Sequence, residues 1–134
     1  MSWQVSSLQL LIRLDYVDHQ LIEQGLAHAA FIGEDLGVWA SSKDYNLSRE
    51  ERQAMFDAFQ DPNKLYKSGL DLAGQYFGPI AADDRIVKVG KENNGAMLVR
   101  MKGFIIMGEY GALAPAQAQY FINKVVDHLT AGGY

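Results

Sequence analysis

The clearest pattern of apolar and polar positions lies in residues 115–134. Apolar side chains recur there at the spacing of one helical face: Ala118, Phe121, Ile122, Val125, Val126 and Leu129. The opposite face is polar and carries Tyr120, Asn123, Lys124 and Asp127. Pro115 suits the first turn, where its missing N–H is not needed, and Gly132 and Gly133 suit a helix end. The pattern predicts a helix that packs its apolar face on the rest of the chain.

Residues 1–24 carry two apolar stripes instead of one. Leu8, Leu11 and Ile12 mark the first, and the second contains Leu10, Leu14, Val17 and Leu21. Two stripes predict either a helix that is apolar around most of its circumference or a helix broken near residues 13–15. Residues 14–22 alone make a short helix that Gly25 ends. The large apolar side chains of residues 5–14 predict that this stretch is covered, by its own fold or by a partner.

Short apolar runs between turn residues predict the strands. A first hairpin joins residues 27–32 to residues 38–41. Later strands are expected at 69–74, 75–80, 85–89, 96–101 and 104–110. Asn93-Asn94-Gly95 favours a hairpin turn, because Asn and Gly accept the positive φ that such turns need. Consecutive strands with tight turns predict an antiparallel meander and not a parallel sheet.

One further helix is expected between the first hairpin and the later strands. Ser48 and Glu51 form a capping box at its start. Met55, Phe56 and Phe59 lie on its buried face, and Pro62 is expected to end it. The predicted fold class is therefore α+β. A central antiparallel meander sheet carries the N- and C-terminal helices on one face and a short helix on the other. Residues 1–134 are expected to form a single domain.

Composition narrows the function classes. The chain of 134 residues has a formal net charge of −4, which makes a bulk nucleic-acid footprint unexpected. It contains no cysteine, which excludes a disulfide framework and suits a reducing compartment. No apolar run approaches the roughly 20 residues of a membrane span, and the N-terminus lacks the basic region of a signal peptide.

The sequence contains no recognisable catalytic or metal-binding constellation. His19, His28 and His128 are scattered and lack paired metal-ligand spacing. No phosphate-cradling glycine motif occurs. Asp83-Asp84-Arg85 is better interpreted as a solvated turn than as an acid pair. We expect no enzyme activity, no cofactor and no metal.

Aromatic residues at distant positions form the first candidate site: Trp3, Tyr16, Trp39 and Tyr134, with His128 and Leu129. If the terminal helices lie side by side, these residues would form a shallow groove. Aromatic grooves bind proline-rich peptides, whose preformed polyproline II helix loses little entropy on docking. The alternative is that Trp39 and Tyr16 are core residues, since large aromatic side chains usually serve packing.

Basic residues in the later strands form the second candidate: Arg85, Lys88, Lys91, Arg100 and Lys102, with Lys124 on the final helix. In an acidic chain this asymmetry indicates a docking surface for an acidic partner or a lipid headgroup. The alternative is that the charges protect solvated strand edges.

Several ordered motifs also point to a known family. They are Met1-Ser2-Trp3-Gln4, Tyr16-Val17-Asp18 with Leu21, Ala29-Ala30-Phe31-Ile32-Gly33, Gly37-Val38-Trp39-Ala40-Ser41, Asp61-Pro62 with Gly69-Leu70, Asp83-Asp84-Arg85, and Asp127-His128-Leu129 with Tyr134. In this order they resemble the profilin family over nearly the whole chain. The resemblance implies a protein that binds monomeric actin, regulates filament assembly and also binds poly-L-proline and phosphoinositides. Sequestration, nucleotide exchange and delivery to barbed ends are the implied modes of regulation.

The resemblance also assigns residues and partners by position. The implied proline site comprises Trp3, Tyr16, Trp39, His128, Leu129 and Tyr134. The implied actin surface comprises Arg85, Lys88, Arg100, Lys102, Tyr120 and Lys124. Monomeric actin, proline-rich proteins such as formins, and phosphoinositide headgroups are the implied partners, in the cytoplasm and cytoskeleton. The alternative function is an adaptor for proline-rich peptides with weak or no actin binding.

One stretch departs from the family pattern. Arg13 stands where the pattern has a tryptophan one helical turn before Tyr16, and residues 5–14 resemble an insertion. In one straight helix Trp3 and Tyr16 would lie about 20 Å apart along the axis. We expect the insertion to fold back and return Trp3 to the groove, or the groove to lack that ring.

Overall fold

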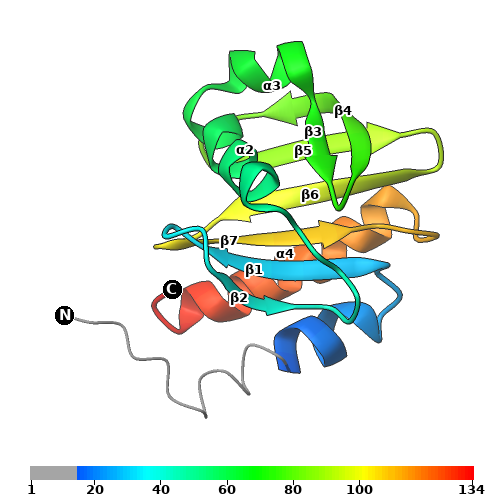
Figure 1. Cartoon of the computed structure of the whole chain (residues 1–134). Coiled ribbons are helices and arrows are strands. Elements are labelled where there is room, and N and C mark those ends of the chain that lie inside the picture. The colour runs from blue at the N-terminus through cyan, green and yellow to red at the C-terminus, as the bar shows by residue number, and fades with distance from the viewer. Residues whose placement is uncertain (1–14) are drawn as a thin grey trace.

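The computed structural model describes residues 15–134, so the expectations for Trp3 and for the insertion at 5–14 lie outside the described residues. Figure 1 shows one antiparallel sheet with the strand order β2-β1-β7-β6-β5-β4-β3. Its strands are β1 (His28–Gly33), β2 (Val38–Ser41), β3 (Leu70–Leu72), β4 (Gln75–Ala82), β5 (Ile86–Lys91), β6 (Asn94–Arg100) and β7 (Phe104–Glu109). The helices are η1 (Tyr16–Ile22, a π-helix), α2 (Arg49–Gln60), α3 (Pro62–Ser68) and α4 (Pro115–Ala131).

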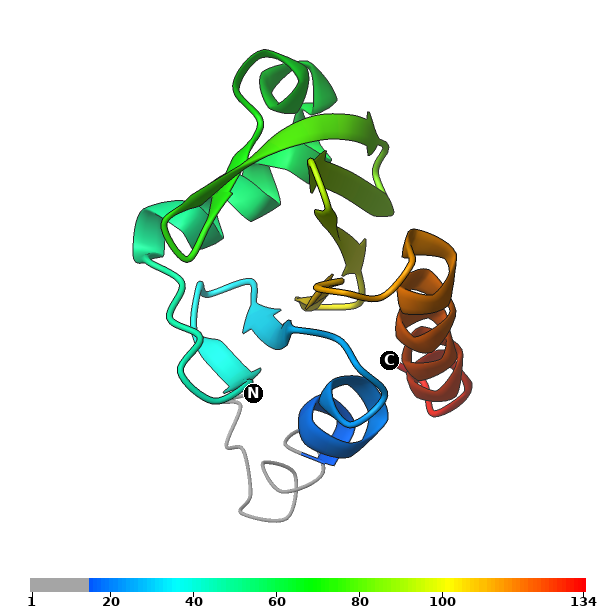
Figure 2. The same ribbon diagram turned by 90° about the vertical axis from the view of Figure 1, so that its right-hand side faces the viewer.

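The helices cover the two faces of the sheet in the predicted arrangement. Figure 2 shows η1 and α4 on one side of the sheet and α2 and α3 on the other. Each side has its own cluster of buried apolar side chains, because neighbouring residues of a strand point to opposite faces. The predicted α+β fold class is therefore confirmed. Within the described residues, no helix is long and apolar enough to cross a membrane.

The sheet differs from a simple meander at one point. Strands β3 to β7 follow one another as predicted, but β7 then pairs with β1, from His28 opposite Glu109 to Gly33 opposite Phe104. The β1–β2 hairpin thus extends the sheet beyond its last strand. No local pattern predicts this pairing, because its two strands are far apart in sequence. It brings the β1–β2 turn beside the β6–β7 turn, where the Glu34 N–H donates to the Gly103 carbonyl at 3.0 Å.

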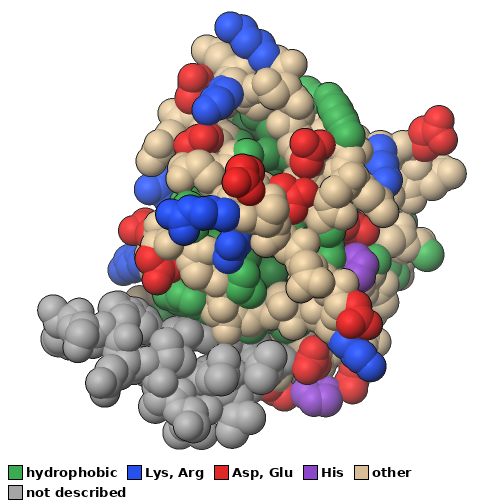
Figure 3. Space-filling model, viewed as in Figure 1, with side chains coloured by type: hydrophobic (Ala, Val, Ile, Leu, Met, Phe, Trp, Pro, Cys, Tyr) green, Lys and Arg blue, Asp and Glu red, His purple; other side chains and the backbone are tan. Residues whose placement is uncertain are grey.

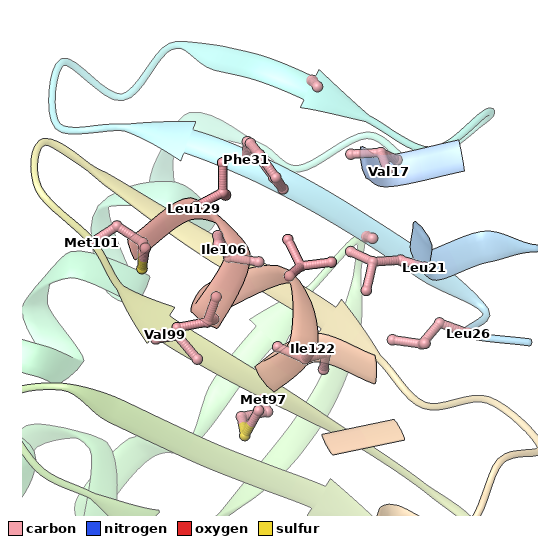
Figure 4. Close-up of a cluster of buried hydrophobic side chains, with 14 of the residues drawn as sticks. Val17, Leu21, Leu26, Phe31, Met97, Val99, Met101, Ile106, Ile122 and Leu129 are labelled. Carbon is pink, nitrogen blue, oxygen red and sulfur yellow. The ribbon is translucent and has the colours of Figure 1, made fainter. Parts of the chain in front are cut away.

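Helix α4 confirms the predicted apolar face. Ala118, Ile122, Val125, Val126 and Leu129 are all buried against the sheet and η1, as the close-up in Figure 4 illustrates for Ile122 and Leu129. Burying each of the Ile, Val and Leu side chains contributes about 1.5–3 kcal/mol. The helix ends as predicted at the glycines, and Gly133 takes a φ of +95°. The Tyr134 N–H then donates to the Leu129 carbonyl at 3.0 Å, which holds Tyr134 against the last turn.

The helices on the other face of the sheet, α2 and α3, differ from the prediction at Pro62. The capping box is present, since the Glu51 N–H donates to Ser48 Oγ and the Ser48 N–H donates to Glu51 Oε1. Helix α2 ends at Gln60, but Pro62 then begins a second helix, α3, which was not predicted from the sequence. A proline ends the helix before it and also fits the first turn of a new helix, so its position alone does not separate the two outcomes.

The β5–β6 turn was also predicted wrongly, one residue too late. Lys91 pairs with Asn94, so the turn consists of residues 92 and 93, and Asn94 and Gly95 belong to β6. The Asn94 side chain instead accepts hydrogen bonds from the N–H groups of Gly95 and Gly111, both at 2.8 Å. Asn94 thereby ties the strand to the segment before α4. Gly95 is needed for close packing, because a Cβ there would lie 2.8 Å from the Tyr110 ring.

Candidate functional site

Five of the residues assigned to the proline site converge from three elements. Tyr16 comes from η1, Trp39 from β2, and His128, Leu129 and Tyr134 from the end of α4. We refer to these five residues as the aromatic surface. The Tyr16 and His128 rings meet edge to face with centroids 5.7 Å apart. Helices η1 and α4 thus bring together residues that are more than one hundred positions apart in sequence.

Two buried phenylalanines form the base of the aromatic surface. The Tyr16 ring stacks on Phe31 with centroids 6.4 Å apart, and Trp39 stacks on Phe104 at 5.1 Å. Phe31 and Phe104 are themselves 5.8 Å apart, so four rings form one continuous row. The sequence pattern predicts Phe104 only as a strand residue, because its contact with Phe31 depends on the unpredicted β1–β7 pairing.

A glycine creates the space for the indole of Trp39. A Cβ added at Gly33 would lie only 2.4 Å from Trp39 Nε1. Gly33 belongs to a buried strand and cannot move aside without disturbing the β1–β7 ladder. Any side chain at position 33 would therefore displace Trp39.

The exposed fractions decide between a binding surface and simple core packing. Val17 and Leu21 of η1 are completely buried, whereas Tyr16 and Trp39 are only partly buried and pack against the edge of the core. Tyr134 is 48% exposed. The pKa of the Tyr16 phenol is raised, mainly by burial and further by electrostatic interaction with Asp15 and Tyr134. The rings thus rest on the core and leave part of their surface to solvent.

The basic residues assigned to the actin surface divide into two groups. Arg85, Arg100 and Lys102 line a hollow of about 380 Å³, together with Asp84, Met101, Thr130, Gly133 and Tyr134. We refer to this feature as the basic hollow. It lies where the β4–β5 and β6–β7 turns approach the end of α4.

The second group lies along α4 and the sheet beside it. Tyr120 is 60% exposed, and Lys124 Nζ lies 6.0 Å from the centre of its ring. Lys88 is half-buried and alternates with Val87 and Val89, which face the α2 side, so Lys88 points to the same face as α4. Lys91 lies apart from both groups, since it contacts Gln75 and the Phe77 ring.

The face that α2 covers is not mainly basic. Figure 3 shows Lys and Arg side chains interspersed there with Asp and Glu. Some of these charges are paired, as in the Asp57–Lys64 salt bridge of 3.2 Å. Among residues 15–134, no salt bridge involves Arg85, Arg100, Lys102 or Lys124.

The polar residues considered for chemistry have structural roles. Asp83 Oδ1 accepts the N–H groups of Arg85 and Ile86, both at 2.7 Å, and these bonds lower the pKa of its carboxyl. This confirms that residues 83–85 form a turn. His19 pairs with Glu23 at 2.9 Å, and the His28 ring stacks on Tyr45. Within the described part of the chain, no group of His, Cys, Asp and Glu residues could hold a metal ion.

The comparisons with known proteins agree with this architecture. The family model described as Profilin matches residues 14–134. The chain belongs to the profilin family. It is 33% identical to Profilin-A of Physarum polycephalum, with all of both chains covered. Its fold is similar to the crystal structure of Acanthamoeba castellanii profilin II, with a TM-score of 0.86 at 32% identity, over 91% of this chain and 99% of that one.

Two more distant structures were solved as complexes. One is mouse profilin IIa with a double repeat from the FH1 domain of mDia1, with a TM-score of 0.60 at 14% identity, covering 85% of this chain and 96% of that one. The other is LokiProfilin1 with rabbit actin, with a TM-score of 0.66 at 13% identity, covering 91% and 97%. At these identities the likeness establishes a shared fold.

Proposed function

We propose that this chain binds monomeric actin and regulates filament assembly, and that it also binds proline-rich peptides such as those of formins. Membership of the profilin family supports this function, as do the complexes of its distant structural neighbours with actin and with an FH1 repeat. Sequestration, nucleotide exchange and delivery to barbed ends are the modes of regulation we expect. Phosphoinositide headgroups are a further proposed ligand, and the cytoplasm and cytoskeleton are the proposed location. We also propose that the chain acts by binding and not as an enzyme.

The observation that carries the peptide-binding part is the row of rings on the aromatic surface. Tyr16 and Trp39 present apolar faces whose positions are set before any ligand arrives, because the rings beneath them are buried. Tyr134 is held at the end of α4 by its backbone bond to Leu129. A preorganised surface loses little entropy on binding, and neither does a polyproline II helix. We assign the proline site to these three residues with His128 and Leu129, and Trp3 retains its expected role there.

The actin-binding part rests on the exposed basic residues and on the outer face of α4. Tyr120 is a residue type that protein interfaces favour at central contacts. The cations Arg85, Arg100, Lys102 and Lys124 form no salt bridge with another residue of 15–134 and suit electrostatic steering. Lys88 extends this surface onto the sheet.

Assembly of pyrene-labelled actin tests the proposal. The full chain should slow spontaneous assembly, and Lys102→Glu should weaken this effect by about tenfold, because the reversed charge would repel an acidic partner. Lys67→Glu is the matched control, since Lys67 is exposed on α3, on the other side of the sheet. Unchanged actin assembly together with intact peptide binding would overturn the actin proposal and support the adaptor alternative.

A further inference from the structure

The basic hollow begins where the aromatic surface ends, and Tyr134 belongs to both. It follows the last turn of α4, where the His128 ring meets the Tyr16 ring edge to face, and its side chain also lines the hollow beside Arg100 and Lys102. The hydrogen bond from the Tyr134 N–H to the Leu129 carbonyl holds it at this junction. A ligand that lies along Tyr16 and continues past Tyr134 therefore enters the hollow.

The side chains that line the hollow have an excess of positive charge. Arg85, Arg100 and Lys102 line it with one acidic side chain, Asp84, and Asp83 interacts with Arg85 from the same turn. None of the three cations forms a salt bridge with another described residue. The backbones of the two arginines meet at the ends of neighbouring strands, where the Arg100 N–H donates to the Arg85 carbonyl at 2.8 Å, so both side chains extend from the same part of the sheet. Guanidinium groups in such an arrangement suit the bidentate binding of carboxylates.

We propose that the preferred ligand is a proline-rich peptide with an acidic flank at one end. The proline stretch lies on the aromatic surface, and the carboxylates of the flank lie in the basic hollow. This inference rests on the proposed peptide binding and adds the charge class of the ligand. Because the hollow also belongs to the proposed actin surface, an acidic-flanked peptide competes with actin, whereas a neutral proline peptide does not.

Two matched peptides test the proposal with the full chain. One is decaproline with a tetraglutamate flank, made with the flank at either end, and the other has tetraglutamine in the same positions. Binding is measured by calorimetry and by tryptophan fluorescence at low and high salt. We expect one acidic-flanked peptide to bind about three- to tenfold more tightly than its glutamine counterpart at low salt, and the difference to shrink as salt screens the charges.

Two variants locate the effect. The double variant Arg100→Gln/Lys102→Gln should remove the difference between the peptides, while Lys67→Gln on α3 should retain it. Equal affinity for both peptides would overturn the proposal and leave the proposed peptide binding intact. Failure of every proline peptide to bind would overturn both. A tetraglutamate peptide without prolines that binds as tightly as the full peptide would show that the hollow is an independent site, which also overturns the proposal.

Discussion

The aromatic surface and the basic surface are built on different physical principles. The rings of Tyr16 and Trp39 rest on Phe31 and Phe104, which are 2% and 3% exposed. The cations of Arg85, Lys102 and Lys124, in contrast, extend into solvent and have no salt-bridge partner among the described residues. The aromatic surface is therefore part of the core packing, whereas the basic surface consists of side chains that extend from the outside of the fold.

This difference separates two kinds of contribution to binding. Rings fixed by the core supply contact area with little loss of side-chain entropy, and their positions depend on the stability of the fold. Exposed charges accelerate encounter and select partners, but they lose side-chain entropy when they bind and weaken with salt. We therefore expect substitutions at the aromatic surface to change folding and binding together, and substitutions at the basic surface to change binding alone.

The largest expected effect is that of Phe104→Ala. Removing this buried ring leaves a cavity beneath Trp39 and Phe31, which should lower the free energy of unfolding by about 3–5 kcal/mol and also weaken binding of a proline peptide. Urea denaturation and a peptide titration measure the two losses. Lys102→Gln is the comparison at the basic surface and should change the unfolding free energy by less than about 0.5 kcal/mol. Similar destabilisation by both variants would contradict the distinction.

Gly33→Ala should have a smaller effect on stability and a clear effect on binding. The added methyl group would overlap Trp39 Nε1 and force the indole to move, at a cost of about 1–3 kcal/mol in unfolding free energy. Loss of the aligned indole should weaken proline-peptide binding by about tenfold or more. Gly78→Ala in β4 is the matched control, because its nearest contact would be an ordinary 3.5 Å from the Gly90 carbonyl oxygen. Wild-type peptide affinity in Gly33→Ala would show that Trp39 does not need its present position.

The smallest effect concerns a pair of charged side chains on η1, the helix that carries Tyr16. Hydrogen bonding to Glu23 and the charge of Glu23 raise the pKa of His19 above its ordinary value of 6.5, and His19 lies on η1 with Tyr16. Because the folded-state pKa is raised, this contribution to stability is fully present below pH 6.5 and is lost as the pH rises through the raised pKa. Glu23→Gln should therefore lower the NMR titration midpoint of His19 and slightly reduce thermal stability at pH 5.5, with no such reduction at pH 8. An unchanged midpoint would contradict the pairing.

Local patterns were sufficient to predict most of the elements. The stripe from Ala118 to Leu129 predicted α4, and the Ser48–Glu51 box predicted the start of α2, because both depend on residues close in sequence. Local patterns were not sufficient at Pro62, because a proline can end one helix or begin the next. They were also not sufficient at Asn94, whose side chain accepts a hydrogen bond from Gly111 far along the chain. The errors thus lie where a residue's role depends on a distant contact.

The residues of the candidate sites could be named from the sequence, but the contacts that position them could not. The family resemblance selected Tyr16, Trp39 and His128, and the structure brings these residues together. Their placement over Phe31 and Phe104 required the β1–β7 register, and the grouping of Arg85 with Arg100 required the fold of the sheet. The assigned functions of these residues remain predictions for the binding experiments.

The pairing of β1 with β7 also has a consequence for synthesis of the chain. A nascent polypeptide that has emerged only as far as β6 contains Trp39 but lacks Phe104, the ring on which Trp39 stacks. The contact between these rings spans much of the chain, and closing so long a loop is slow compared with forming a local hairpin. Capture of a proline ligand would therefore report that translation and folding of the sheet are complete, and a truncated product would not compete for that ligand.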